Sequence, residues 1–139
     1  MGVKSENTNM ASEFYVMSIL YRIGVEPVLT LGNKKDIDIV LQRHSETYTI
    51  DVKGLKGKTS WFIGNKEKIK SFAKMKNHYF VFVSYLNKFH DTDSQPEIYI
   101  VPAVEVVRLK VNWGSHDQNS IEYRDLKKSK FLNAWHYFK

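Results

Sequence analysis

The stretch DIDIVLQRHSETYTIDVK at residues 36–53 contains two apolar runs that are bounded by charged residues and separated by a polar turn at residues 44–46. The composition and alternation of these runs predict two antiparallel strands joined by that turn. In such a hairpin Asp38 lies opposite Asp51. Lys53 lies on the same strand face as Asp51, because side chains alternate along a strand.

Carboxylates that face each other across two strands destabilise a sheet. Asp36 adds a third carboxylate to this face, roughly opposite Lys53. A divalent cation between the carboxylates reverses the sign of their interaction, and hard cations such as Mg²⁺ prefer carboxylate oxygens. The stretch therefore indicates a metal site beside a lysine, a combination that points to phosphodiester chemistry. The alternative is a set of solvent-exposed aspartates at strand ends, with Lys53 in a weak surface ion pair.

The length and composition of the chain limit the classes of protein to consider. We expect a single domain over residues 1–139, with enough hydrophobic residues (42%) to form a real core. The lack of cysteine excludes a disulfide framework and thiolate zinc sites, and fits a reducing compartment. No apolar run is long enough to span a membrane, and the N-terminus has no signal-like region. We therefore expect a cytoplasmic protein without a membrane partner.

Positive charge is concentrated in one segment of the chain. Residues 53–76 contain eight lysines and one acid, a net charge of +7, whereas the whole chain carries +6. A concentrated basic segment is typical of proteins that bind nucleic-acid phosphates, although a lysine-rich helix face that is merely solvated has the same composition. Five lysines are predicted phosphate contacts: Lys56, Lys58, Lys66, Lys68 and Lys70.

The apolar patterning predicts an α/β (α+β) fold in which helices flank a mixed central β-sheet. Helices are expected at residues 7–23, 65–75 and 102–109, and in the aromatic C-terminal tail. Strands are expected at residues 25–31, 37–43, 47–53, 59–63, 79–85 and 97–101. The first helix carries a broad apolar stripe made of Phe14, Met17, Ile19, Leu20 and Tyr21. The run at 79–85 is apolar throughout, which suits a buried central strand.

The order of these features resembles the PD-(D/E)xK nuclease superfamily, and within it the small Holliday-junction-resolvase and Mrr-like restriction endonuclease type. The resemblance rests on Glu13 in the first helix, on Asp38 at the start of an apolar strand, and on the Asp51-Val52-Lys53 triplet that ends the next strand. It covers residues 10–63 most closely.

The chain departs from the pattern of that superfamily at three points. Ile37 stands where the proline of the family name would precede Asp38, Asp51 replaces the more usual glutamate, and no glutamine follows Lys53. A second Asp-x-Lys triplet begins at Asp125, but no acidic strand precedes it.

The resemblance implies a restriction-endonuclease-like core and a metal-dependent endonuclease that hydrolyses DNA. It implies Mg²⁺ or Mn²⁺ held by Asp38, Asp51 and Glu13. Asp36 is either an accessory metal ligand or a decoy, and Asp38 is preferred to it because Asp38 starts the apolar strand. Lys53 would stabilise charge on the reacting phosphate, or position or deprotonate the attacking water. The expected partners are duplex or branched DNA and a second copy of the chain in a homodimer. A further hypothesis is that the chain is a subunit of a restriction or mobile-element system whose specificity comes from a separate protein.

Two alternatives accompany this interpretation. In the first alternative, the chain is a catalytically inactive module with a nuclease fold that binds nucleic acid or a partner protein. RNA in place of DNA also stays open. Among the tryptophans, Trp61 is assigned to the core in preference to base stacking, and Trp113 and Trp135 are assigned to packing. The histidines show no zinc-hydrolase spacing.

Overall fold

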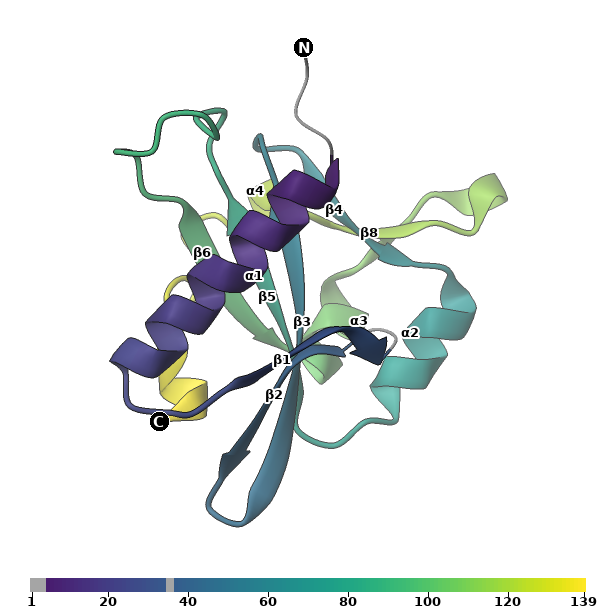
Figure 1. Cartoon of the computed structure of the whole chain (residues 1–139). Helices are drawn as coiled ribbons and strands as arrows, with labels where there is room; N and C mark the ends of the chain where they lie inside the picture. The colour runs from purple at the N-terminus through teal and green to yellow at the C-terminus, as the bar shows by residue number, and fades with distance from the viewer. Residues whose placement is uncertain (1–4, 35–36) are drawn as a thin grey trace.

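The structure is a computed structural model that describes residues 5–34 and 37–139 (Figure 1). The described elements are, in chain order, α1 (Ser5–Arg22), β1 (Val28–Lys34), β2 (Ile37–Arg43), β3 (Glu46–Leu55), β4 (Ser60–Gly64), α2 (Lys66–Ala73), β5 (His78–Ser84), β6 (Glu97–Pro102), α3 (Ala103–Leu109), β7 (Val111–Asn112), η1 (Gly114–His116), β8 (Asn119–Glu122), α4 (Tyr123–Leu126) and η2 (Trp135–Phe138). None of these helices is long and apolar enough to cross a membrane.

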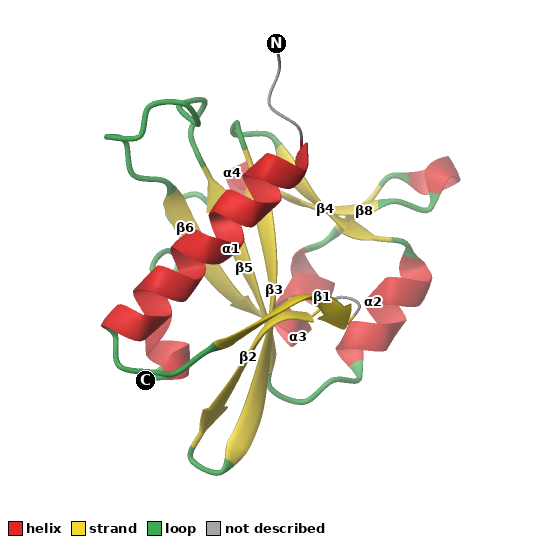
Figure 2. Ribbon diagram, in the orientation of Figure 1, coloured by secondary structure: helices red, strands yellow, loops and turns green. Residues whose placement is uncertain are grey.

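The central sheet has five strands in the order β1-β2-β3-β5-β6 (Figure 2). The β3–β5 pair is parallel and the other three pairs are antiparallel, so the sheet is mixed. Strand β5 is apolar and almost entirely buried, because both faces of the sheet are covered around it. The predicted fold class, a mixed central sheet flanked by helices, is confirmed.

The β2–β3 hairpin has the register that the sequence predicts. Ile39 pairs with Ile50 and Arg43 pairs with Glu46, which leaves only His44 and Ser45 in the turn. Both turn residues have positive φ, 51° and 66°. Two consecutive residues with positive φ characterise the type I′ turn, whose twist matches that of the flanking strands.

Two hydrophobic clusters cover opposite faces of the central sheet. On one face, α1 packs Val16 and Leu20 against Ile50 and Val52 of β3. Gly54 continues this face of β3, and a Cβ atom there would lie only 3.0 Å from the backbone oxygen of Thr8. The absence of a side chain therefore allows α1 to lie close to β3. On the other face, α2, α3 and a second sheet surround a cluster rich in aromatic residues.

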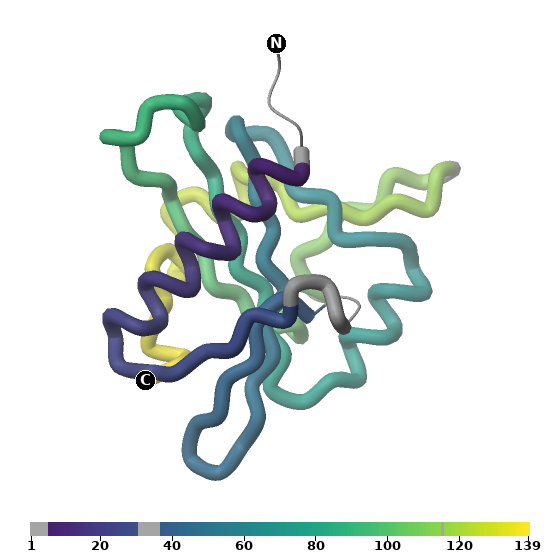
Figure 3. Tube along the Cα trace, in the orientation of Figure 1, coloured from purple at the N-terminus to yellow at the C-terminus, as the bar shows by residue number. Residues whose placement is uncertain are grey.

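The second sheet has three strands in the order β4-β8-β7. The strand predicted at residues 59–63 exists as β4, but its partner is β8, which the sequence patterning did not predict. Trp61 of β4 is buried against Phe82, Tyr99 and Tyr123, so its assignment to the core is confirmed. The chain trace shows the β7–β8 turn at the outer end of this sheet (Figure 3).

Two predictions about helices were partly wrong. The apolar stripe of α1 lies on two faces of the helix, because Leu20 is buried while Phe14 and Tyr21 are each 57% exposed. The aromatic tail forms only the short 3₁₀ helix η2. Its residue Phe138 is fully buried and contacts Tyr79. The C-terminal tail therefore contributes to the core through its side chains and not through a long helix.

Candidate active site

Four of the predicted site residues converge on one hollow of about 240 Å³. The residues that line it are Asn9, Glu13, Asp38, Asp51, Val52 and Lys53. Helix α1 and strands β2 and β3 each contribute, so the hollow forms only when the helix packs beside the hairpin. Asp36, the predicted accessory ligand, lies outside the described residues.

Asp38 lies at the open end of the β2–β3 hairpin, far from the turn. The register of the β2–β3 hairpin, continued by one residue beyond Ile39 and Ile50, sets Asp38 opposite Asp51. Its carboxylate oxygen Oδ2 accepts a hydrogen bond of 2.7 Å from the backbone N–H of Val52. This bond holds the Asp38 carboxylate against β3, the strand that carries Asp51 and Lys53.

Asp51 and Lys53 form an ion pair within β3. The distance from Lys53 Nζ to Asp51 Oδ1 is 3.3 Å, the Asp51 side chain is buried, and the Lys53 side chain is half-buried. The two residues point to the same side because side chains alternate along the strand. Burial of a carboxylate is costly without a compensating charge, and the ammonium group of Lys53 supplies one.

Glu13 brings a third carboxylate to the hollow from α1. The residue is only 8% exposed. Burial, and then the negative charge of Asp38, raise the pKa of Glu13 from 4.5 to about 7. Its carboxyl group is therefore close to half protonated at neutral pH, which is the range where a carboxyl group works as a proton donor or acceptor.

The donor set of the hollow fits a hard divalent cation. Asp38 and Asp51 offer carboxylate oxygens from adjacent strands, and a cation near them would also lower the raised pKa of Glu13. Within residues 5–34 and 37–139, no group of three or more acidic or histidine side chains is close enough to hold a metal alone. Mg²⁺ commonly takes one or two carboxylates and keeps several waters, which this pair can satisfy.

The predicted phosphate-binding lysines flank the second sheet. Lys56 and Lys58 are exposed in the connection from β3 to β4, and Lys66 and Lys70 are exposed on α2. Lys68 is half-buried, and its backbone N–H donates to the side chain of Asn65, which caps the helix. The structure shows where these lysines lie, and their contacts with phosphate stay a prediction.

Sequence reasoning missed one residue of the hollow and two exposed aromatic residues of the second sheet. Asn9 lines the hollow. It could have been predicted, because it precedes Glu13 by four residues and therefore lies on the same face of the helix. Trp113 is 52% exposed, so its assignment to packing was wrong. Phe62 is 57% exposed beside the buried Trp61, which is the alternation expected of a strand with one solvent face.

No protein-family model matches this sequence, and neither does any curated protein. Two solved structures resemble the fold. The first is Hjc, a Holliday junction resolvase from the archaeal hyperthermophile Archaeoglobus fulgidus, with a TM-score of 0.55 and 14% identity over 85% of this chain and 86% of that one. The second is the bacterial homing endonuclease I-Ssp6803I, with a TM-score of 0.51 and 15% identity over 96% of this chain and 90% of that one.

Both neighbours have PD-(D/E)xK-type nuclease folds. The chain therefore has this fold as well, and the fold that the Glu13, Asp38 and Asp51-Val52-Lys53 pattern predicted is confirmed. At such low identity the likeness concerns the arrangement of helices and strands, and the chemistry of the site has to be argued from the residues of this chain.

Proposed function

We propose that this protein is a metal-dependent endonuclease that hydrolyses phosphodiester bonds in duplex or branched DNA. The observation that carries the proposal is the convergence of Glu13, Asp38, Asp51 and Lys53 on one hollow of a nuclease fold. A cytoplasmic, DNA-associated location is part of the same proposal. Dependence on a separate specificity protein stays a prediction from the sequence.

Each residue of the hollow has a separate role in the proposed hydrolysis of the phosphodiester bond. Asp38 and Asp51 would hold Mg²⁺ or Mn²⁺, which when bound polarises the phosphate and acidifies a coordinated water. Lys53, held beside Asp51 at 3.3 Å, places a positive charge where the phosphate gains negative charge. Glu13, with a pKa of about 7, exchanges a proton with water near neutral pH. Asn9 adds a polar side chain to the wall of the hollow.

One observation favours the second candidate, an inactive module that binds DNA or a partner. The ion pair with Lys53 already compensates the buried charge of Asp51, so a metal is not needed to stabilise that carboxylate. Titration calorimetry with Mg²⁺ and Mn²⁺ separates the candidates. Binding that is lost in Asp38→Asn supports the nuclease, and no binding by the unaltered protein supports the module.

The decisive test is a cleavage assay at low salt with Mg²⁺ or Mn²⁺, on supercoiled plasmid, single-stranded DNA and a four-way junction. We expect metal-dependent cleavage that falls by at least about a hundredfold in Asp51→Asn and in Lys53→Met. The chain offers a matched control in its second Asp-x-Lys triplet, which starts at the exposed Asp125. Asp125→Asn should cleave normally. Full cleavage by the double variant Asp38→Ala/Asp51→Ala would overturn the proposal.

We further propose that the chain acts as a homodimer, because cutting both strands of a duplex takes two active sites. The outer face of α1 is the surface that fits a second copy. Met10, Phe14, Met17 and Tyr21 follow one another at intervals of four, three and four residues, which places them on one side of the helix. The series of intervals is the same in both directions along the helix. Two antiparallel copies of α1 therefore bring Phe14 of each copy next to Met17 of the other.

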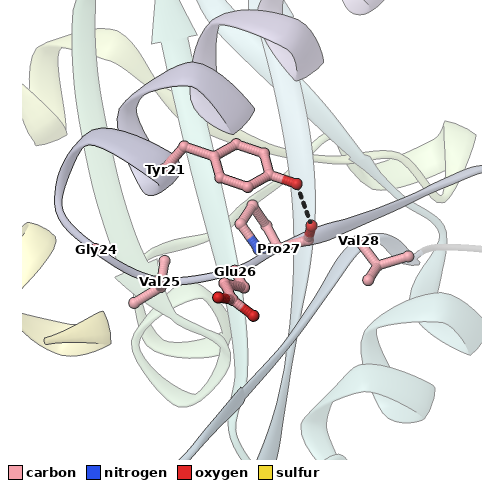
Figure 4. A pocket seen from close by; sticks show the side chains of 6 residues that line it. All are labelled: Tyr21, Gly24, Val25, Glu26, Pro27 and Val28. Carbon is pink, nitrogen blue, oxygen red and sulfur yellow. Dashed lines mark hydrogen bonds between the residues drawn. The ribbon is translucent and has the colours of Figure 1, made fainter.

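Charge and shape support an antiparallel arrangement. Glu6 lies in the first turn of α1 and Arg22 in its last turn, so antiparallel helices bring opposite charges together at both ends. A hollow of about 480 Å³ adjoins Tyr21, and both apolar residues and the exposed Glu26 line it (Figure 4). In Figure 4 the Tyr21 hydroxyl donates to the backbone oxygen of Pro27, and the exposed Val28 borders the hollow.

Sedimentation of the purified protein tests this dimer. We expect the unaltered chain to sediment as a dimer and the variant Phe14→Gln/Tyr21→Gln as a monomer. Val104→Gln is the control, because Val104 is a 73%-exposed apolar residue on α3, away from α1. A monomeric unaltered protein, or a dimer that survives in the double variant, would refute the arrangement.

A further inference from the structure

The outer face of the second sheet carries two exposed aromatic rings. Phe62 of β4 pairs with Ser120 of β8, and Val111 of β7 pairs with the same Ser120 on the other side. Paired residues in antiparallel strands point to the same face, so these three side chains form one row. Trp113 follows Val111 by two residues and therefore returns to this face.

A hydrogen bond confirms the position of Trp113. Its Nε1–H group donates to Ser120 Oγ at 2.8 Å. The two rings thus lie on either side of Ser120, and each remains more than half exposed: 57% for Phe62 and 52% for Trp113. The hydrogen bond holds the indole by its Nε1 edge, and about half of the residue stays exposed to solvent, as stacking on a flat ligand requires.

Packing within the chain accounts for only part of these two rings, which cover the buried Ser120 and leave more than half of each residue exposed. The inner face of the same sheet is covered, since Trp61, Ile63 and Ile121 are each at most 3% exposed. The inner face therefore anchors the sheet to the core, whereas Phe62 and Trp113 contribute almost nothing to that anchoring. Large apolar side chains on a solvent face indicate a binding surface when they are adjacent.

The charges around this face favour a polyanion. Lys56 and Lys58 precede β4 and Lys66 follows it. The backbone N–H of Lys66 donates to Asp117 at 3.1 Å, which ties the start of α2 to the β7–β8 turn beside Trp113. Two acids lie close to this face as well: Asp117 accepts the hydrogen bond from Lys66, and Glu122 accepts one from Ser120. Flat rings flanked by lysines match a chain that alternates bases and phosphates.

We propose that the outer face of the β4-β8-β7 sheet binds single-stranded nucleic acid, with unpaired bases stacked on Phe62 and Trp113 and phosphates near the flanking lysines. Sheet surfaces with exposed aromatic side chains are suited to this ligand. Bases inside a duplex are already stacked and do not reach such a surface. This inference rests on the proposed nuclease function and narrows its substrate to DNA with a single-stranded segment, such as a branch, a flap or a frayed end.

The test is binding of a fluorescent oligothymidylate, measured by anisotropy in EDTA so that no cleavage occurs. We expect Phe62→Ser and Trp113→Ser each to weaken binding by about five- to a hundredfold. The salt dependence of binding should stay unchanged, because neither change removes a phosphate contact. Binding of blunt duplex should change by less than about twofold. Val104→Ser, at an exposed apolar position on α3, should bind both ligands normally.

A conservative variant separates stacking from misfolding. Trp113→Phe keeps a flat ring and should retain most of the affinity for the oligothymidylate. It should also lose the quenching of tryptophan fluorescence that a stacked base causes in the unaltered protein. Failure of the unaltered protein to bind oligothymidylate, or an equal loss for single strands and duplex in the serine variants, would overturn the proposal. Metal-dependent cleavage measured in parallel shows whether the nuclease function stands when the stacking surface fails.

Discussion

Glu13 makes the stability of this protein depend on pH in an unusual direction. Burial and the charge of Asp38 raise its pKa from 4.5 to about 7 in the folded state. A group whose folded pKa is raised contributes stability that is fully present below the unfolded pKa and is lost as the pH rises through the folded pKa. The loss therefore runs from about pH 4.5 to about pH 7.

The size of the loss follows from the shift. Each pKa unit corresponds to about 1.4 kcal/mol, so the charged form of Glu13 costs the folded state about 3 kcal/mol at pH 8. The substitution Glu13→Gln removes the titration and keeps a polar side chain of nearly the same size. We expect Glu13→Gln to match the unaltered protein near pH 4.5 and to be more stable by about 3 kcal/mol at pH 8.

Urea unfolding in EDTA, followed by circular dichroism at several pH values, measures this difference. Asp125→Asn is the control, because Asp125 is exposed and lies outside both the hollow and the proposed dimer surface. Adding Mg²⁺ at pH 8 should stabilise the unaltered protein more than Glu13→Gln, since a cation bound beside Glu13 favours its charged form. A stability difference between the two proteins that is the same at pH 4.5 and pH 8 would refute the reasoning.

Substitutions at three further places in the chain test the local geometry by urea unfolding. Gly54→Ala places a Cβ atom against Ser12 Oγ and should destabilise the protein by about 1–3 kcal/mol. The double variant Gly54→Ala/Ser12→Ala should recover part of that loss. Full stability of Gly54→Ala would refute the close approach of α1 to β3. Replacing the turn by His44→Asn/Ser45→Gly suits the positive φ angles of both residues and should stabilise by about 1 kcal/mol; a less stable variant would contradict the turn geometry. Asn65→Ala removes the side-chain cap of α2 and should cost about 1 kcal/mol, whereas Asn65→Asp should cost little.

The hairpin and the charged residues on it were predictable because they depend on local rules. Strand alternation alone sets Lys53 on the face of Asp51, and the turn at His44 and Ser45 fixes the register that faces Asp38 toward Asp51. The convergence of Glu13 on these residues was implied only by the resemblance to the nuclease superfamily, because its helix meets β3 through tertiary packing.

The features that were missed depend on contacts between distant parts of the chain. Strand β8 has four residues and β7 has two, too few for a period-two pattern, and β8 pairs with β4 across a long separation in sequence. The stripe of α1 was assigned to one face because hydrophobic spacing does not distinguish a helix with one apolar face from a helix with two. Phe14 and Tyr21 belong to the second, exposed face.

The parallel pairing of β3 with β5 has a consequence for the folding kinetics of the site. The β2–β3 hairpin closes through a two-residue turn, and such hairpins form within microseconds. Strand β5 is separated from β3 in the chain by β4 and α2, and contacts of this range form slowly. Asp38 and Asp51 therefore meet while water still surrounds and screens them. The dehydration of Asp51 is deferred to the docking of β5, by which time Lys53 is already beside it on the same strand.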